Sequence, residues 1–229
     1  MSCHARLAVV VVVALVSGEA AGQESASSLR LHVEGAADPS IVRVEYMLAG
    51  PFGGYRRQLR GSATVDIPIV VDGQPAQSLK AIIFCPGYRT VQVAIPELAA
   101  QTELRVALDA LAARPLTGTV EFVNGATPRS FVLDIDVVLG SSHKFFGIID
   151  GAPTTFDVAQ AVVSPEGDFS VVIADLAQDE SLQSPDLPTV FRFQARDAAT
   201  GNFVFDLQPR NVAIEELPPE LVLSASPAL

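Results

Sequence analysis

The chain has 229 residues, of which 49% are hydrophobic, so it can bury a core and intrinsic disorder is not expected. Its formal net charge of −11 repels phosphate backbones and anionic lipid surfaces, which argues against nucleic acids and charge-driven membrane docking. Gly and Pro, 16 of each, are scattered along the chain and favour many turns and short strands over long helices.

Residues 1–22 have the pattern of a secretory signal peptide. Arg6 precedes an apolar run at 7–16, and small residues follow the run. This run is too short to cross a bilayer as a helix. We therefore expect cleavage after Ala20 or Gly22 and a secreted or periplasmic protein, with no membrane insertion once the segment is removed.

Apolar and polar residues alternate through the first half of the mature chain, as in strands that have one buried face. This alternation predicts strands within 29–35, 41–48, 63–71, 81–84 and 90–95. Pro68 marks one of them as an edge strand or a bulge, since proline cannot donate to a ladder. Residues 97–111 fit either a helix or a strand. We expect a helical turn near 96–101 and then a strand at 103–109.

The stretch "FCPGYRT" holds Cys85, the only cysteine left once residues 1–22 are removed. A lone cysteine cannot form an internal disulfide. The Pro-Gly pair beside it predicts a tight turn between two strands. Because the sequence places no base next to the thiol, we interpret Cys85 as a small, partly buried residue at a strand end, not a nucleophile.

The second half repeats the alternating pattern after "AARPL", which we interpret as a linker. Strands are predicted within 116–125, 130–140, 144–150, 156–164, 168–176 and 212–226, with a hairpin at 189–209 around the turn "AATGN". Such spacing is typical of β-sandwiches. We therefore predict an all-β chain with two tandem antiparallel β-sandwich domains of the transthyretin or Ig-like kind, at 28–111 and 116–225.

Three stretches resemble one known family. They are "LTGTV", with Gly118 and Val120, the turn and strand "SPEGDFSVVIADL", and the strand pair "LKAIIFCPGYRTVQV". Together they resemble carboxypeptidase regulatory-like domains, which are transthyretin-like β-sandwiches. The resemblance implies a non-catalytic support, spacer or recognition module on an exported bacterial protein. The transthyretin-like hydrolases of purine breakdown end in "YRGS". The "YRRQLRGS" at 55–62 is internal and interrupted, so we do not expect that activity.

Two loops are candidates for binding. "PFGGYRR" combines two aromatic side chains with two arginines and suits an acidic or planar partner. "KFFG" places two phenylalanines side by side, so one of them is exposed for contact or a bulge hides both. The partner is expected to be a protein or a glycan. The candidate binding residues are Phe52, Tyr55, Arg56, Arg57, His143, Phe145 and Phe146.

No catalytic, metal-binding or cofactor-binding residues are predicted. Asp134, Asp136, Asp157 and the acidic residues of 175–186 are interpreted as solvated surface charge. One alternative is a calcium-stabilised adhesive module that uses these carboxylates. The other is a secreted hydrolase, which would need a cleft that brings His143 to a carboxylate and a nucleophile.

Overall fold

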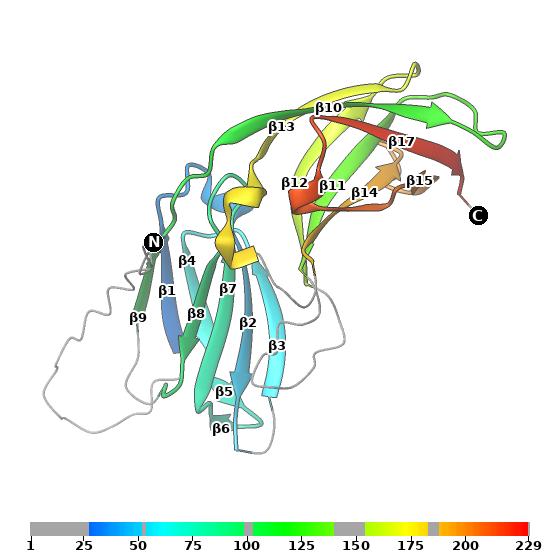
Figure 1. Ribbon diagram of the computed structural model, residues 1–229. Coiled ribbons are helices and arrows are strands. Elements are labelled where there is room, and N and C mark those ends of the chain that lie inside the picture. Colours follow the sequence, from blue (N-terminus) through cyan, green and yellow to red (C-terminus); the bar gives the residue numbers. More distant parts are fainter. Residues whose placement is uncertain (1–27, 52–53, 99–102, 140–153, 183–187, 229) are drawn as a thin grey trace, which may run out of the picture. The chain divides into compact units, whose positions relative to one another are not determined.

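The computed structural model describes residues 28–51, 54–98, 103–139, 154–182 and 188–228 (Figure 1). These residues form strands and short 3-10 turns, and no α-helix occurs among them. The all-β prediction is therefore confirmed, whereas the predicted signal peptide lies outside the described part. No helix in that part is long and apolar enough to cross a membrane.

The chain divides into two compact units. Unit 1 comprises Met1–Ile82 and Val93–Leu108, and unit 2 comprises Ile83–Gln92 and Asp109–Leu229. The stretch "AARPL" is not a linker as expected, because β10 (Ala113–Phe122) already begins within it. Pro115 is tolerated in this strand because β17 (Glu220–Pro227) pairs with β10 only from Thr117 onward.

Unit 1 contains two main sheets. The first has the order β4 (Thr64–Pro68), β1 (Ser28–Glu34), β9 (Glu103–Ala107). The second has the order β3 (Gly54–Arg60), β2 (Arg43–Ala49), β7 (Ser78–Phe84), β8 (Val91–Ile95). A 3-10 turn at Pro39–Ile41 and a small pair, β5 (Val70–Val71) with β6 (Gln74–Pro75), complete the unit.

The alternation in the sequence sets which side chains enter this core. The apolar members of β1 and β2 are buried, with Leu29, Leu31, Val44 and Leu48 each at most 1% exposed. Their burial removes apolar surface from water, which is the main favourable term for folding. β4 lies at the sheet edge, as Pro68 indicated.

Residues 103–107 are a strand, which confirms the strand expected there. β9 pairs with β1 in parallel, so the prediction of purely antiparallel sheets is wrong at this place. The alternation of apolar and polar residues shows that one face of a strand is buried. It does not show whether the strand pairs in parallel or antiparallel, because both kinds of pairing give the same alternation. Cys85 lies at the end of a strand, as expected, but it is fully buried and not partly buried. Its side chain is buried after β7, and a turn with Gly87 at φ +92° follows.

Unit 2 contains one long sheet that begins and ends at neighbouring strands. Its path is β12 (Thr154–Val163), β11 (Phe131–Leu139), β14 (Val190–Arg196), β15 (Phe203–Gln208), β17, β10, β13 (Asp168–Ala174). β12 and β13, the two ends of this path, contact each other. Phe122, Phe131 and Phe205 come from different strands, and their ring centroids lie 5.2–6.5 Å apart in edge-to-face pairs. Phe131 and Phe205 are buried, and Phe122 is half-buried.

The first and last strands of unit 2, β10 and β17, also pair in parallel and lie side by side in Figure 1. Gly118 permits this close pairing. A Cβ atom there would lie 2.1 Å from the Leu221 carbonyl oxygen and 2.6 Å from the Phe169 ring. The missing side chain therefore allows both the backbone approach and the ring packing.

We expect Gly118→Ala to destabilise the protein by about 3 kcal/mol, because the carbonyl that the new methyl group meets belongs to a paired strand. Urea unfolding monitored by circular dichroism measures this loss. Gly201→Ala is the control. It adds a methyl group where nothing lies within 4 Å and costs only the strain of its φ of +70°, about 1 kcal/mol. Equal losses in the two variants would contradict the packing argument.

Candidate functional site

β14 has two different partners along one of its edges. Val190–Arg192 pair with β16 (Asn211–Ala213), whereas only Ala195 and Arg196 pair with β15. Between these two ladders the amide N–H of Phe193 donates to the carbonyl of Arg210 at 2.9 Å. Apart from this one bond, residues 193–194 have no ladder partner among the described residues on this edge, where β15 would otherwise continue.

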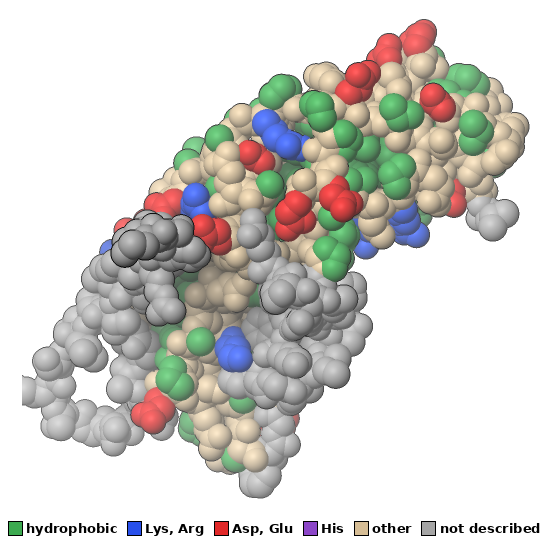
Figure 2. Space-filling view, viewed as in Figure 1, with side chains coloured by type: hydrophobic (Ala, Val, Ile, Leu, Met, Phe, Trp, Pro, Cys, Tyr) green, Lys and Arg blue, Asp and Glu red, His purple; other side chains and the backbone are tan. Residues whose placement is uncertain are grey.

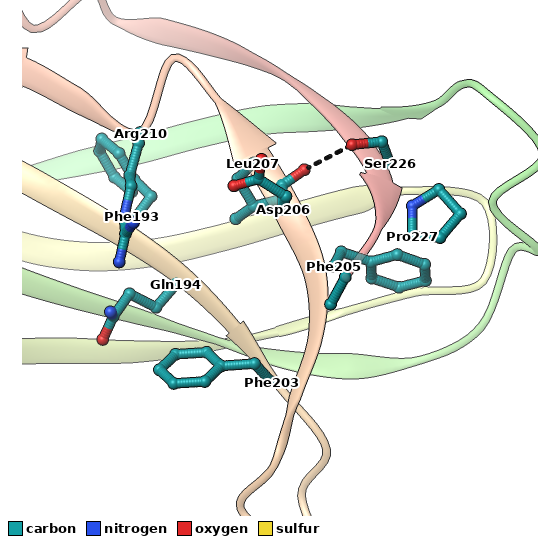
Figure 3. Close-up of a pocket in the computed structure, with 10 residues that line it drawn as sticks. Phe193, Gln194, Phe203, Phe205, Asp206, Leu207, Arg210, Ser226 and Pro227 are labelled. Carbon is teal, nitrogen blue, oxygen red and sulfur yellow. Dashed lines mark hydrogen bonds between the residues drawn. The ribbon is translucent and has the colours of Figure 1, made fainter.

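This opening forms a groove of about 500 Å³, which we call the β14–β15 groove (Figure 3). Its apolar wall consists of Phe193, Phe205, Leu207 and Pro227. Polar side chains from the same strands and from the β15–β16 connection line the rest, namely Gln194, Asp206, Arg210 and Ser226. An apolar wall with a few polar groups is the usual composition of a ligand site.

Phe203 supplies an exposed aromatic face at this groove. The β14–β15 ladder pairs Ala195 with Phe205 but Arg196 with Phe203, so β15 carries one extra residue, Val204, at a bulge. The bulge interrupts the alternation. Phe205 is therefore buried with Ala195, whereas Phe203 lies on the side of Arg196 and remains 52% exposed.

Arg196 holds the Phe203 ring from one side. Its guanidinium carbon lies 4.3 Å from the ring centroid, the geometry of a cation–π contact. The same guanidinium forms an ion pair with Asp134, with Nε and the carboxylate oxygen 2.7 Å apart, and donates a hydrogen bond to the Gly201 carbonyl at 3.2 Å. Because Arg196 is fixed by these partners, the ring is positioned before any ligand arrives.

Asp206 and Arg210 differ from the other charged residues of this region. Neither side chain has a hydrogen-bond or ion-pair partner within the described ranges. Asp206 is an acceptor only and Arg210 a donor only when both are ionised. The groove therefore offers hydrogen-bonding groups of both kinds that the fold itself does not use.

The neighbouring pair Asp136–Arg192 is structural. Asp136 on β11 accepts a hydrogen bond of 2.8 Å from Arg192 on β14, and only 7% of Asp136 is exposed. Burial raises the pKa of Asp136 above its ordinary value of 3.8, and the Arg192 bond opposes this effect. Asp157 and Asp134 raise this pKa further.

The acidic residues are not simply solvated, as the sequence analysis had assumed. Asp136 and Asp179 are buried, and Asp179 accepts bonds from the Thr90 amide at 2.7 Å and from the Ser181 hydroxyl at 2.6 Å. Exposed Asp and Glu side chains are spread over the visible face in Figure 2. Within the described ranges, no three potential metal ligands gather into one cluster.

The predicted binding residues fall into two groups. Tyr55, Arg56 and Arg57 lie in the edge strand β3, not in the expected loop, because pairing with β2 already begins at Gly54. Arg56 is paired with the buried Glu45 of β2. Phe52, His143, Phe145 and Phe146 lie outside the described residues.

Sequence reasoning missed Phe203, Asp206 and Arg210. It predicted the hairpin correctly, and its turn is held by Asp197, which accepts bonds from the amides of Ala199 and Thr200. Strict alternation, however, would place Phe203 on the same face as Phe205. The "TGN" sequence before "FVF" was a usable signal, since bulges are common beside such turns.

No family model matches the sequence, and no curated protein matches it. Among solved structures, the shaft pilin SpaA from Lactobacillus rhamnosus GG is 8% identical, covering 89% of this chain and 98% of that chain, with a TM-score of 0.27. The Bacillus anthracis TIE protein is 10% identical, covering 88% of this chain and 34% of that one, with a TM-score of 0.28. Likeness at this level assigns neither a family nor a function.

The pKa of Asp136 predicts a pH effect on stability. Because the pKa of Asp136 is higher in the folded state than in the unfolded state, the protonated carboxyl group stabilises the folded protein. This contribution is fully present below about pH 4 and is lost as the pH rises through the folded-state pKa. Urea unfolding of the wild type and Asp136→Asn between pH 3 and 7 isolates this effect from other groups. The wild type should lose stability relative to the variant as pH rises. A relative gain would contradict the assigned direction.

Proposed function

We propose that the protein is an exported, non-catalytic binding module whose β14–β15 groove holds a short saccharide. The observation that carries this proposal is the exposed face of Phe203, positioned by Arg196 at a groove where the Asp206 and Arg210 side chains have no partner among the described residues. The proposal keeps the binding role and the glycan partner expected from the sequence. It moves the saccharide site away from the two loops to the groove in unit 2.

A saccharide fits the mixed chemistry of the groove. The C–H groups of a pyranose ring pack on a flat aromatic face, and its hydroxyl groups both donate and accept hydrogen bonds. Asp206 can accept and Arg210 can donate. The Gln194 oxygen already accepts from Arg196, and the Ser226 hydroxyl already donates to the Asp206 carbonyl, so these residues add the amide N–H donors and the hydroxyl acceptor. An entirely apolar ligand would instead leave these groups without partners, which is unfavourable.

Binding is favoured over hydrolysis by the number of carboxylates at the groove. Glycoside hydrolysis uses two carboxyl groups that flank the scissile bond. Among the ten lining residues, Asp206 is the only carboxylate. The adjacent acids, Asp134 and Asp136, are committed to Arg196 and Arg192.

The test is a glycan array with neutral and uronate-containing oligosaccharides, followed by calorimetry on a glycan that binds. Phe203→Leu keeps apolar area but removes the flat ring and should weaken binding about tenfold, since stacking contributes on the order of 1 kcal/mol. Phe203→Trp should retain binding. Asp206→Asn and Arg210→Gln should each weaken binding because each removes a charged hydrogen-bonding group.

The matched control is Val222→Ala, which shortens a 49% exposed apolar side chain outside the groove. This variant should bind like the wild type. An array without a bound glycan would contradict the proposal, and so would equal weakening by Phe203→Leu and Val222→Ala.

Export is a separate part of the proposal, supported by the signal-peptide pattern of residues 1–22. We expect the full chain, expressed in a bacterium with a secretion pathway, to be recovered outside the cytoplasm. The mass of the intact protein should show a chain that starts at Ala21 or Gln23. An uncleaved cytoplasmic chain would contradict export without affecting the groove.

A further inference from the structure

β3 is an edge strand of unit 1. It pairs with β2 over all seven of its residues, Gly54–Arg60, and the sheet order ends at this strand. Within the described residues, its second edge has no partner strand. An unpaired edge presents backbone N–H and C=O groups that can accept another extended segment.

The charge of β3 is opposite to that of the whole chain. The strand contains Arg56, Arg57 and Arg60 and no acidic residue, whereas the chain carries a net charge of −11. Arg56 is already paired with Glu45, so it belongs to the fold. Arg57 and Arg60 form no ion pair with any described residue, and Arg60 is exposed.

The strand is also fixed in position. The Tyr55 hydroxyl donates to the Pro68 carbonyl of β4 at 3.2 Å, which links β3 to the other sheet of unit 1. Tyr55 also contacts the buried Tyr46 of β2 edge-to-face, with ring centroids 6.2 Å apart. Burial, the largest cause, raises the pKa of Tyr46 to about 12, so its hydroxyl stays neutral.

The arginines of β3 determine what charge a segment that binds this edge should carry. Two copies of β3 placed edge to edge would bring like charges together, which opposes self-pairing of this strand. An acidic strand would instead place carboxylates beside Arg57 and Arg60. We propose that β3 accepts an extended acidic segment of another protein as an added strand of the sheet β3-β2-β7-β8.

The test measures peptide binding by fluorescence anisotropy with the purified protein. Arg57 and Arg60 are three residues apart, so their side chains point to opposite faces of the strand. The probe is therefore a labelled peptide of repeating Glu-Glu-Val-Val, which carries glutamate on both faces, and its control replaces glutamate by lysine. The glutamate peptide should bind about tenfold more tightly or better, because two favourable charge contacts become two unfavourable ones in the control. Equal affinity for the two peptides would overturn the proposal.

N-methylation of the glutamate peptide separates strand addition from simple charge attraction. Two methylated peptides are compared, one with methyl groups on the odd-numbered backbone nitrogens and one with methyl groups on the even-numbered ones. One of the two loses the N–H donors that face the edge of β3, and both keep every charge. That peptide should lose binding about tenfold or more, and the other should retain it. If both methylated peptides bind like the parent, no strand is added and the proposal fails. This measurement uses the unmodified protein and does not depend on any variant folding.

Charge reversal at the strand locates the site. Arg57→Glu combined with Arg60→Glu should bind the lysine peptide and lose the glutamate peptide. The matched control is Arg30→Glu combined with Arg105→Glu, which changes net charge equally on exposed positions of the other sheet. The control should still prefer the glutamate peptide. If both double variants lose this preference alike, net charge explains the binding and β3 is not the site.

Discussion

The candidate site depends on the division of β14 between two partners. One strand pairs with β16 at its start and with β15 at its end, and it cannot pair with both in between. A continuous β14–β15 ladder would seal the sheet beside Phe193 and bury the positions that now line the groove. β15 stays attached through its ladder with β17 and through the aromatic contacts of Phe205 with Phe122 and Phe131, despite its short ladder with β14. Packing here replaces the stabilisation that the missing backbone bonds would have given.

Charged residues on β11 and β14 give this arrangement its rigidity. Asp134 and Asp136 on one strand bind Arg196 and Arg192 on the next, so each arginine has a fixed position. Such partly buried pairs gain little net stability, because desolvation offsets much of the Coulomb attraction. They do fix geometry, and Arg196 transmits that order to the Phe203 ring. Asp206 lacks such a partner among the described residues, so it has no comparable structural role and stays available to the proposed ligand.

The sequence predicted much of the fold because alternation directly reports which face of a strand is buried. It placed Leu133 and Ile135 of β11 inward, and both are buried. It also expected solvated aspartates on this strand, but Asp136 is buried beside Arg192. It could not report strand direction, so the parallel pairs of β1 with β9 and β10 with β17 were missed. It also failed at Val204, where one inserted residue reverses the alternation and exposes Phe203. Partners distant in sequence, such as Arg192 for Asp136, are set by register, which a local pattern does not contain.

The net charge of −11 affects the two proposed sites differently. A neutral saccharide is not repelled by the chain, so its binding depends on contacts inside the groove. An acidic segment is repelled at long range by the net negative charge of the chain. It is attracted only close to β3, because the arginines of this strand are few compared with the acidic residues of the whole chain. At physiological ionic strength charges are screened beyond about 8 Å, which removes the distant repulsion more than the close attraction. Salt therefore has two opposing effects on the β3 contact, and the association should depend on salt only weakly despite its ionic character.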